Sequence, residues 1–457
     1  MIKEKCGLCA LIGAQRDACI GSKLYKGLSA LQHRGQESAG AVIIDSKATL
    51  IRNRGLVRDV FFQFNGLSNY GGQIALGHVR YGKDGETDKE TQPIMLNSSV
   101  GEIYLAYNGC VTNCSELIDE LPQSYVASDG RITDIESIGY TLIKNIEKTN
   151  DLTASLKKLL SQVKGAYTLI VLIKNTIYCL RDKFGFRPLC YGRTNLGQFV
   201  FASETCALNA VSATIEGEIR PGELVVCNGN KITFDTEFCG KVSPSPCCFE
   251  YFYFADRSSV LSGNLVSKIR CDAGRLLARK KPVSCDLVIG VPDSGIDSAK
   301  GYAKEANLPY AEGFIRNTNI RRTFIVPNQE ERERLVQAKL LAIPSVVKGK
   351  EIVVVDDSIV RGTTAIHIVK LLRDAGAKKI HMRISSPKFI YDCPYGTDIG
   401  KPETLIAYNR TTEEIAQVLG VDTLEYLEPL DIAVLVGGGF STMCMACFNG
   451  EYPDVDE

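Results

Sequence analysis

The sequence predicts two domains of different fold class, an α+β domain followed by an α/β domain. The chain has 457 residues, and a single hydrophobic core rarely grows beyond about 250–300 residues. The pattern of apolar residues changes at Lys268, and a Pro- and Ser-containing stretch, Gly240–Cys248, precedes that change. We therefore predict a first domain over residues 6–240 and a second over residues 241–457.

The first half contains short β-branched and aromatic runs that are separated by turns. These runs are GAVII, GQIALGHVRY, EIYLAYNG, GAYTLIVLI, TIYCLRD and GQFVFASE. Two stretches with helical periodicity lie between them, at 134–148 and 152–162. The pattern is typical of paired antiparallel sheets with helices outside, and we predict an α+β domain.

The second half alternates helices and strands. Strands of continuous Val and Ile lead into a turn and an amphipathic helix, as in DLVIGVPDSG and KEIVVVDDSIVRGTT. Such strands are typical of a parallel sheet that is buried on both faces. We predict an α/β domain of a phosphate-binding type.

Composition excludes several classes of partner and location. The chain carries 53 basic and 53 acidic residues, so its charge does not favour nucleic acid or an anionic membrane as a partner. The N-terminal segment does not resemble a signal peptide, and the longest apolar runs have the length of strands. We expect a cytoplasmic protein.

The chain has 17 cysteines, which are spread over its whole length. In a long chain without an export signal, this spread argues against a disulfide framework. We expect reduced thiols, most of them small buried residues, with a few catalytic or metal-bound members.

The sharpest local signal is VVVDDSIVRGTT, at Val353–Thr364. A buried strand ends in Asp356 and Asp357, and the following turn opens a helix. Backbone N–H groups at such a turn bind a phosphate, and Gly362 allows close approach of the backbone. Carboxylates at the carboxyl end of the strand bind sugar hydroxyls or a hydrated divalent ion. The alternative is that these acids only cap the helix, but the number of polar residues in nine positions favours a sugar-phosphate site.

This stretch resembles the signature of the type I phosphoribosyltransferases. The resemblance implies that the loop holds a ribose 5-phosphate and that the acids bind its hydroxyls and Mg²⁺. A second turn, in VIGVPDSGIDSA, is by itself as consistent with a plain turn, but beside the first it resembles the pyrophosphate loop and implies Mg²⁺ ligands Ser294, Asp356 and Asp357. The implied residues that bind phosphoribosyl pyrophosphate are Asp356, Asp357, Ser358, Arg361, Gly362, Thr363, Thr364 and Lys339.

The first half carries a second set of motifs. Cys6-Gly7 is followed by LQHRGQESAG, GHVRYG and AYNG. A single early cysteine is usually structural, but the set together resembles the class II glutamine amidotransferases. The resemblance implies the paired-sheet N-terminal nucleophile (Ntn) hydrolase sandwich for the first domain.

That resemblance also implies roles for single residues. A cysteine thiol needs a base near neutral pH, and in this family the base is the α-amino group of the nucleophile itself. Cys6 must then become the first residue, and residues 1–5 form a propeptide. Asn108 and the Gly109 N–H are implied as oxyanion donors, and Arg80 as the partner of the glutamine carboxylate.

Two acids are candidates for binding the amino group of glutamine, Asp129 and Asp134. We favour Asp134, because Thr133 and Glu136 around it form a capping box that begins a helix. Asp129 is the reserve candidate.

Both resemblances occur together, in this order, in the amidophosphoribosyltransferase family. The family's pattern is also followed by RDKFGFRPL, FASETCAL, RPGE, CFEYFYFA, EGFIRN and RRTFIVPNQEER. Membership implies hydrolysis of glutamine at Cys6 and transfer of ammonia to phosphoribosyl pyrophosphate, which gives 5-phosphoribosylamine in the first step of de novo purine biosynthesis. It further implies a homotetramer or homodimer and inhibition by purine nucleotides.

One branch of this family carries a [4Fe–4S] cluster, whose cysteines match Cys247, Cys393, Cys444 and Cys447. The CxxC at Cys444–Cys447 taken alone is equally consistent with zinc, redox chemistry or a core position. Four thiolates from three segments are typical of a cubane cluster, and a structural zinc site is the alternative. Cys248 is expected to be an apolar neighbour rather than a ligand.

Some residues depart from the family's pattern. Gly82–Gly85 replace the usual Ser or Thr and small residues after Tyr81, Tyr107 replaces a usual histidine, and the loop Arg316–Phe324 has lost a tyrosine and one arginine. Gln337 and Leu341 differ around Lys339. Two alternatives therefore stay open: a divergent paralogue with another acceptor or phosphoribosyl substrate, and a non-catalytic regulatory subunit.

Overall fold

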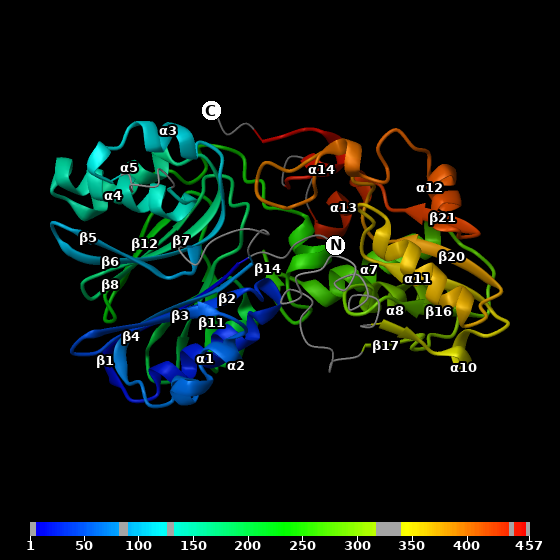
Figure 1. The fold of residues 1–457 in the computed structure, drawn as a ribbon, viewed down its shortest axis with the longest axis horizontal. Coiled ribbons are helices and arrows are strands. Elements are labelled where there is room, and N and C mark those ends of the chain that lie inside the picture. Colours follow the sequence, from blue (N-terminus) through cyan, green and yellow to red (C-terminus); the bar gives the residue numbers. More distant parts are fainter. Residues whose placement is uncertain (1–5, 82–89, 126–131, 317–339, 438–442, 454–457) are drawn as a thin grey trace.

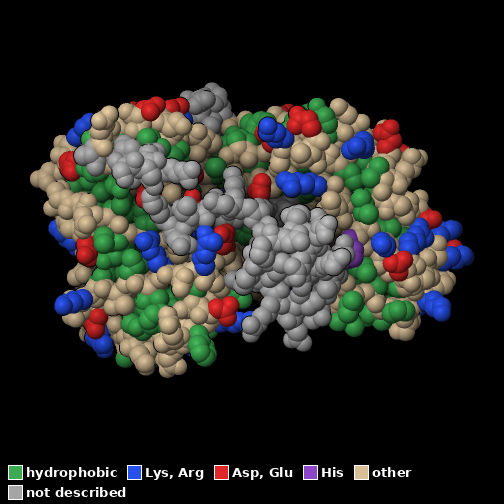
Figure 2. Space-filling view, in the orientation of Figure 1, with side chains coloured by type: hydrophobic (Ala, Val, Ile, Leu, Met, Phe, Trp, Pro, Cys, Tyr) green, Lys and Arg blue, Asp and Glu red, His purple; other side chains and the backbone are tan. Residues whose placement is uncertain are grey.

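The computed structural model describes residues 6–81, 90–125, 132–316, 340–437 and 443–453. Its two halves lie side by side, with the blue-to-green first half on the left of Figure 1 and the green-to-red second half on the right. Basic and acidic side chains are both scattered over the face seen in Figure 2. In the described part of the chain, no helix combines the length and the apolar character needed to cross a membrane.

The first half is a sandwich of two antiparallel sheets. One sheet runs, in spatial order, β11 (Ala213–Glu218), β9 (Cys190–Thr194), β10 (Phe199–Ala202), β1 (Gly7–Asp17), β4 (Gly72–Arg80), β2 (Ser38–Ile44) and β3 (Ala48–Arg54). The other runs β13 (Ile232–Asp235), β12 (Leu224–Cys227), β8 (Thr176–Arg181), β7 (Gly165–Ile173), β6 (Gly101–Val111) and β5 (Ile94–Ser98).

Three apolar layers hold this sandwich together. Residues such as Leu8, Leu76 and Ile170 form the layer between the sheets. The outer face of the first sheet packs on α1 (Ile20–Ala30) and α6 (Thr205–Ala210). The outer face of the second packs on α4 (Asp134–Thr149) and α5 (Leu152–Gln162). The predicted α+β class and both predicted helices are confirmed.

The second half contains a parallel sheet. Its strand order is β16 (Leu287–Gly290), β19 (Glu351–Asp356), β20 (Lys379–Ile384) and β21 (Thr423–Tyr426). One face packs on α7 (Val266–Lys280) and α8 (Gly295–Ala306), and the other on α11 (Thr363–Asp374) and α12 (Thr412–Leu419). Alternate residues of β19 enter the two cores, Val353 on one side and Val354 on the other, so the α/β prediction is confirmed.

Shorter elements complete the described fold. These are α2 (Val57–Val60), α3 (Cys114–Asp119), α10 (Pro344–Val347), α13 (Pro429–Val436), α14 (Ala446–Asn449), the π-helical turn η5 (Glu250–Phe254), the 3₁₀ turns η1 (Gln32–Arg34), η2 (Phe62–Leu67), η4 (Gln123–Tyr125) and η7 (Pro402–Thr404), and the paired strands β14 (Val260–Leu261) with β15 (Asn264–Leu265) and β17 (Phe314–Arg316) with β18 (Leu340–Ala342).

The segment between the halves stays attached to the sandwich. The Ser245 N–H donates to the Phe184 carbonyl at 2.7 Å, and the Cys247 N–H donates to the Phe186 carbonyl at 3.2 Å. Cys247 also forms an isolated parallel bridge with Cys444, near the C-terminus. The boundary between residues 240 and 241 stays a prediction.

Candidate active sites in the two halves

Cys6 lies immediately before β1, a central strand of the first sheet. Its side chain is half-buried, and its Sγ lies 3.9 Å from the Tyr81 carbonyl oxygen. The Arg34 Nε donates to the Cys6 carbonyl oxygen at 3.1 Å. The start of β1 is also held by the Ser203 hydroxyl, which accepts from the Leu8 N–H at 2.9 Å. The backbone of the candidate nucleophile is therefore fixed on both sides, while its thiol stays accessible.

Asn108 and Gly109 lie on β6, in the opposite sheet. Asn108 is fully buried, and neither polar atom of its side chain has a hydrogen-bond partner among the residues that the structure describes. A Cβ at Gly109 would lie 1.8 Å from the Ala166 carbonyl oxygen, so only glycine fits against β7. A buried amide with no hydrogen-bond partner destabilises the fold. An incoming oxygen atom would supply the missing partner for its N–H group.

His78 and Arg80 lie on the same face of β4, because successive side chains of a strand alternate. Burial and the nearby Arg80 lower the pKa of His78 to about 3, so its imidazole is neutral. Its Nε2 lies 3.1 Å from the Tyr107 carbonyl oxygen, which assigns the ring proton to Nε2. Arg80 forms an ion pair with Glu90, a partner that the motifs did not indicate.

Asp134 is the first residue of α4, and the predicted capping box of Thr133 and Glu136 is present. Its carboxylate accepts from the Tyr107 hydroxyl at 3.1 Å and from the Val111 N–H at 3.3 Å. Burial, then the charges of Asp134 and nearby thiols that include Cys6, raise the pKa of Tyr107, so this phenol stays protonated. Asp129, the reserve candidate, lies outside the described residues.

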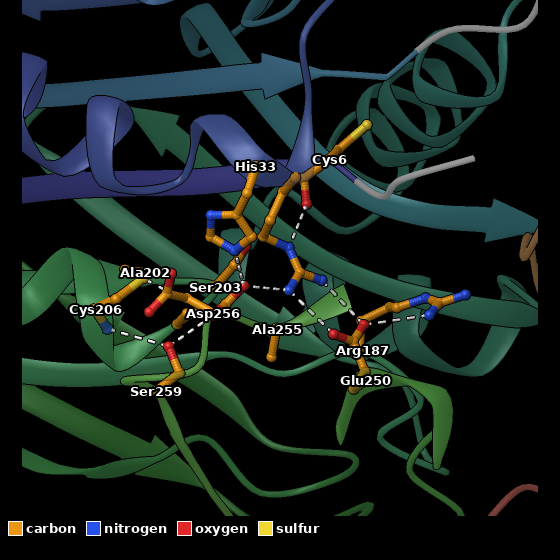
Figure 3. A network of polar contacts seen from close by, with 12 residues as sticks. Cys6, His33, Arg187, Ala202, Ser203, Cys206, Glu250, Ala255, Asp256 and Ser259 are labelled. Atoms are coloured by element: carbon orange, nitrogen blue, oxygen red, sulfur yellow. Dashed lines mark hydrogen bonds and ion pairs between the residues drawn. The ribbon is translucent and has the colours of Figure 1, made fainter. Parts of the chain in front are cut away.

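A buried ionic network lies behind Cys6 (Figure 3), and no role was predicted for its members from the sequence. Arg34 contacts Glu204 at 2.5 Å and Glu250 at 2.9 Å, and Arg187 contacts Glu250 at 3.3 Å. All four side chains are at most 3% exposed. The segments that contain these residues follow the family's pattern, and that pattern was the signal that could have pointed to them. No local motif or periodicity connects residues that lie so far apart in the chain.

The second candidate site lies where β19 ends. Asp356 and Asp357 are 7% and 5% exposed. The hydroxyls of Ser294 and Ser358 each donate to Asp357 at 2.5 Å. Burial raises the pKa of both carboxyls, and the charge of Asp357 raises that of Asp356 further. The structure thus brings Ser294 and the two acids together, as the sequence predicted.

The loop after these acids has the backbone that a phosphate cradle requires. Gly362 precedes α11 with φ +83°, and a Cβ there would lie 2.4 Å from Ile406. The side chains of Arg361, Thr363 and Thr364 are exposed at this edge. Lys339 lies outside the described residues, as does most of the loop Arg316–Phe324.

The four predicted cluster cysteines come from three segments of the chain but lie in one region. Burial raises the pKa of Cys447, and the nearby Cys248, Cys393, Cys247 and Cys444 raise it further. Cys248 is fully buried, and its N–H donates to the Cys444 carbonyl at 3.3 Å. All seventeen cysteines are free thiols. Within the described ranges, no three or more His, Cys, Asp or Glu side chains form a group able to hold a metal ion.

Comparison with known proteins matches both halves. A glutamine amidotransferase domain matches residues 78–210, and a phosphoribosyl transferase domain matches residues 268–385. The amidophosphoribosyltransferase of Methanocaldococcus jannaschii is 39% identical, over 98% of this chain and 97% of that protein.

Two solved structures agree over almost the whole chain. One is an allosteric regulatory enzyme of purine biosynthesis, with a TM-score of 0.88 and 37% identity over 98% of this chain and 96% of that one. The other is the glutamine phosphoribosylpyrophosphate amidotransferase of B. subtilis in complex with ADP and GMP. Its TM-score is 0.87, and the identity is 37% over 98% of this chain and 97% of that one.

Proposed function

This chain belongs to the amidophosphoribosyltransferase family, and from that premise we propose how its own residues carry the reaction. The enzyme transfers the amide nitrogen of glutamine to phosphoribosyl pyrophosphate, in purine biosynthesis. The observation that carries the residue assignments is the pair of sites described above. One contains a cysteine whose backbone is held by Arg34 and, on β6 of the opposite sheet, a buried amide with no partner among the described residues. The other contains paired acids at the carboxyl end of a parallel strand.

In the first half-reaction, the Cys6 sulfur attacks the amide carbon of glutamine. The α-amino group of Cys6 takes the thiol proton and delivers it to the leaving nitrogen, so that ammonia departs and a thioester remains. Water then cleaves the thioester and releases glutamate. This base exists only when Cys6 is the first residue, so residues 1–5 act as a propeptide.

The groups around Cys6 have separate tasks in this scheme. The Asn108 amide and the Gly109 N–H stabilise the oxyanion of the tetrahedral intermediate. Arg80 binds the substrate carboxylate in place of Glu90, and Asp134 binds the substrate amino group. Support comes from the free polar atoms of Asn108 and from the fixed orientation of Asp134.

In the second half-reaction, ammonia attacks the anomeric carbon of phosphoribosyl pyrophosphate and pyrophosphate leaves. Asp356 and Asp357 bind the ribose hydroxyls, and Ser358, Arg361, Gly362, Thr363 and Thr364 hold the 5-phosphate. Lys339, which lies outside the described residues, is assigned a contact with the substrate. Two adjacent buried acids, of which Asp357 accepts a hydrogen bond from the Ser294 hydroxyl, are suited to a hard cation. Ser294, Asp356 and Asp357 would hold Mg²⁺, which would supply charge compensation for the departing pyrophosphate.

We further propose a [4Fe–4S] cluster on Cys247, Cys393, Cys444 and Cys447. Their convergence in one buried region supports it. The same four cysteines could instead hold a structural zinc ion, which is the second candidate.

Regulation and assembly also belong to the proposal. A B. subtilis relative was solved with ADP and GMP, which supports purine nucleotides as inhibitors here. A homotetramer or homodimer and a cytoplasmic location complete the expected setting. The altered loop at Arg316–Phe324 leaves a paralogue with a different acceptor as the second candidate function.

Paired assays test the function. Purified enzyme is given glutamine with and without phosphoribosyl pyrophosphate, and glutamate and phosphoribosylamine are both measured. We expect phosphoribosylamine from glutamine and from ammonia, and an intact mass that begins at Cys6. Glutamate release without phosphoribosylamine would indicate the paralogue, and neither product would indicate a non-catalytic subunit.

Metal analysis tests the cluster. Protein purified without oxygen should contain about four irons and four sulfides per chain. Cys393→Ser or Cys447→Ser should remove them, whereas Cys248→Ser, the matched control, should retain them. Stoichiometric zinc without iron would establish the zinc alternative.

A further inference from the structure

The ionic network behind Cys6 crosses from one half of the chain to the other. Arg34 belongs to the first half and Glu250 to the second, and they are 216 residues apart in sequence. Two hydrogen bonds join them, from the Arg34 guanidinium nitrogens to the two Glu250 oxygens at 3.0 and 2.9 Å. This fork-to-fork arrangement fixes both the distance and the plane of the guanidinium.

Arg34 also donates to groups other than Glu250, and one of them is the backbone of Cys6. One bond goes to Glu204 at 2.5 Å, and the Nε–H goes to the Cys6 carbonyl oxygen at 3.1 Å. In Figure 3 the Cys6 carbonyl points toward this network, while its sulfur points away from it. The guanidinium plane that Glu250 sets therefore also sets the position of the nucleophile's backbone.

A second arginine of the first half, Arg187, also joins Glu250 to the second half. Arg187 donates to Glu250 at 3.3 Å and to the Tyr395 carbonyl oxygen at 2.8 Å. Arg187 is fully buried and is near the Cys247 and Cys393 thiols. The two arginines are paired with buried glutamates in this network, so loss of one member leaves a buried charge without its partner.

We propose that Arg34 and Glu250 are positioning residues for the glutamine site, through which the second half of the chain holds the nucleophile in place. The assignment rests on Cys6 being that nucleophile. Without Glu250, Arg34 keeps only its bond to Glu204 on the carboxylate side, and its plane is free to rotate. The Nε–H then leaves the Cys6 carbonyl, and the sulfur loses its alignment with the oxyanion donors. Misplacement of about 1 Å costs up to about a hundredfold in rate.

Glu250→Gln and Arg34→Lys test this role. Gln keeps the shape of Glu250 but not its charge, and Lys keeps the charge of Arg34 but not its fork. We expect each variant to lower kcat for glutamine hydrolysis by about tenfold to a hundredfold. The KM for glutamine and the rate of ammonia-dependent synthesis should each stay within about twofold of the wild-type value. The rate at which iodoacetamide alkylates Cys6 should differ from that of wild type.

Glu223→Gln is the matched control, because Glu223 is a buried carboxylate that pairs with Arg220 within the first half. It should leave all three measurements unchanged. Wild-type kcat in both test variants would overturn the proposal, and so would an equal loss of glutamine- and ammonia-dependent synthesis, which indicates general misfolding. A wild-type enzyme without glutaminase activity, or one that keeps it after Cys6→Ala, would instead refute the proposed function.

Discussion

At the glutamine site the polar groups near the nucleophile are neutral or already paired, whereas at the phosphoribosyl site two buried carboxylates lie side by side. His78 is neutral, Asn108 is uncharged, and Arg80 is paired with Glu90. Asp356 and Asp357 both have raised pKa values, and Asp357 accepts hydrogen bonds from two serine hydroxyls.

This difference follows from the chemistry that each half performs. The first site must stabilise an oxyanion that exists only briefly, and preorganised neutral dipoles do this without binding the ground state strongly. The second must bind a polyanion and a cation, so it keeps charge at the edge of the sheet. We therefore expect charge removal to affect the second site most, and removal of a single dipole to affect the first.

The largest effect should come from Asp356→Asn together with Asp357→Asn. Both changes remove the charge that binds the ribose and Mg²⁺, so synthesis from glutamine and from ammonia should fall below detection while the protein stays folded. Asp286→Asn is the control, because Asp286 is an exposed acid at the amino end of the same sheet. Synthesis that persists in the double variant would show that the acids have no part in sugar binding.

Asn108→Ala should produce the next largest effect. Loss of one oxyanion donor lowers kcat by about 10²–10³-fold in other amide-cleaving enzymes, and ammonia-dependent synthesis should not change. Asn145→Ala is the control, since Asn145 is equally buried but bonds to Gln162 at 2.7 Å. A glutaminase rate within twofold of wild type would remove Asn108 from the oxyanion site.

Tyr107→Phe should have a smaller effect, on binding rather than on rate. The change removes the hydroxyl that orients Asp134, and a hydrogen bond of this kind contributes about 0.5–1.5 kcal/mol. We expect KM for glutamine to rise by about threefold to tenfold, with kcat little changed. Tyr104→Phe, on the same strand with its hydroxyl on Glu102 at 2.6 Å, is the control. An unchanged KM for glutamine would show that Asp134 does not bind the amino group of the substrate.

His33→Gln should have the smallest effect, visible as a change in the pH dependence of stability. Burial lowers the pKa of His33, but the charge of Glu204 outweighs it and raises the pKa above its ordinary value of 6.5. Both ring nitrogens face acceptors, at 3.0 and 2.8 Å, which suits the protonated ring. A group of this kind stabilises the fold below pH 6.5, and the contribution is lost as pH rises through the folded-state pKa.

Unfolding in denaturant should therefore show a larger difference between wild type and His33→Gln at pH 6 than at pH 9. Arg34, Glu204 and Asp256 are the charged groups that act on this ring. His367→Gln, which changes a histidine of the second half, is the control. A difference that grows with pH would contradict the assignment.

The sequence predicted the structure correctly where the pattern lies within one short stretch of residues. The alternating runs predicted the antiparallel sandwich, the continuous Val and Ile strands predicted the parallel sheet, and Thr133 with Glu136 predicted the start of α4. Asp356 and Asp357 could be placed at the carboxyl end of a parallel strand from the local pattern, whereas Ser294 was placed near them by the resemblance to the phosphoribosyltransferases.

The sequence was insufficient where partners come from distant segments. No periodicity connects Arg34 with Glu250, and their pairing depends on how the two halves pack. The Arg80–Glu90 ion pair was missed for a similar reason, since the motif ends at Gly82. The unpartnered state of Asn108 depends on the packing of two sheets against each other, which strand patterns do not specify.

The most direct test of the two-site account is Cys6→Ala, assayed for phosphoribosylamine with glutamine and, separately, with ammonia. Ammonia bypasses the first site and needs only the second. The account predicts no product from glutamine and a wild-type rate from ammonia. Product from glutamine at the wild-type rate, or loss of product from both nitrogen sources in a folded protein, would contradict it.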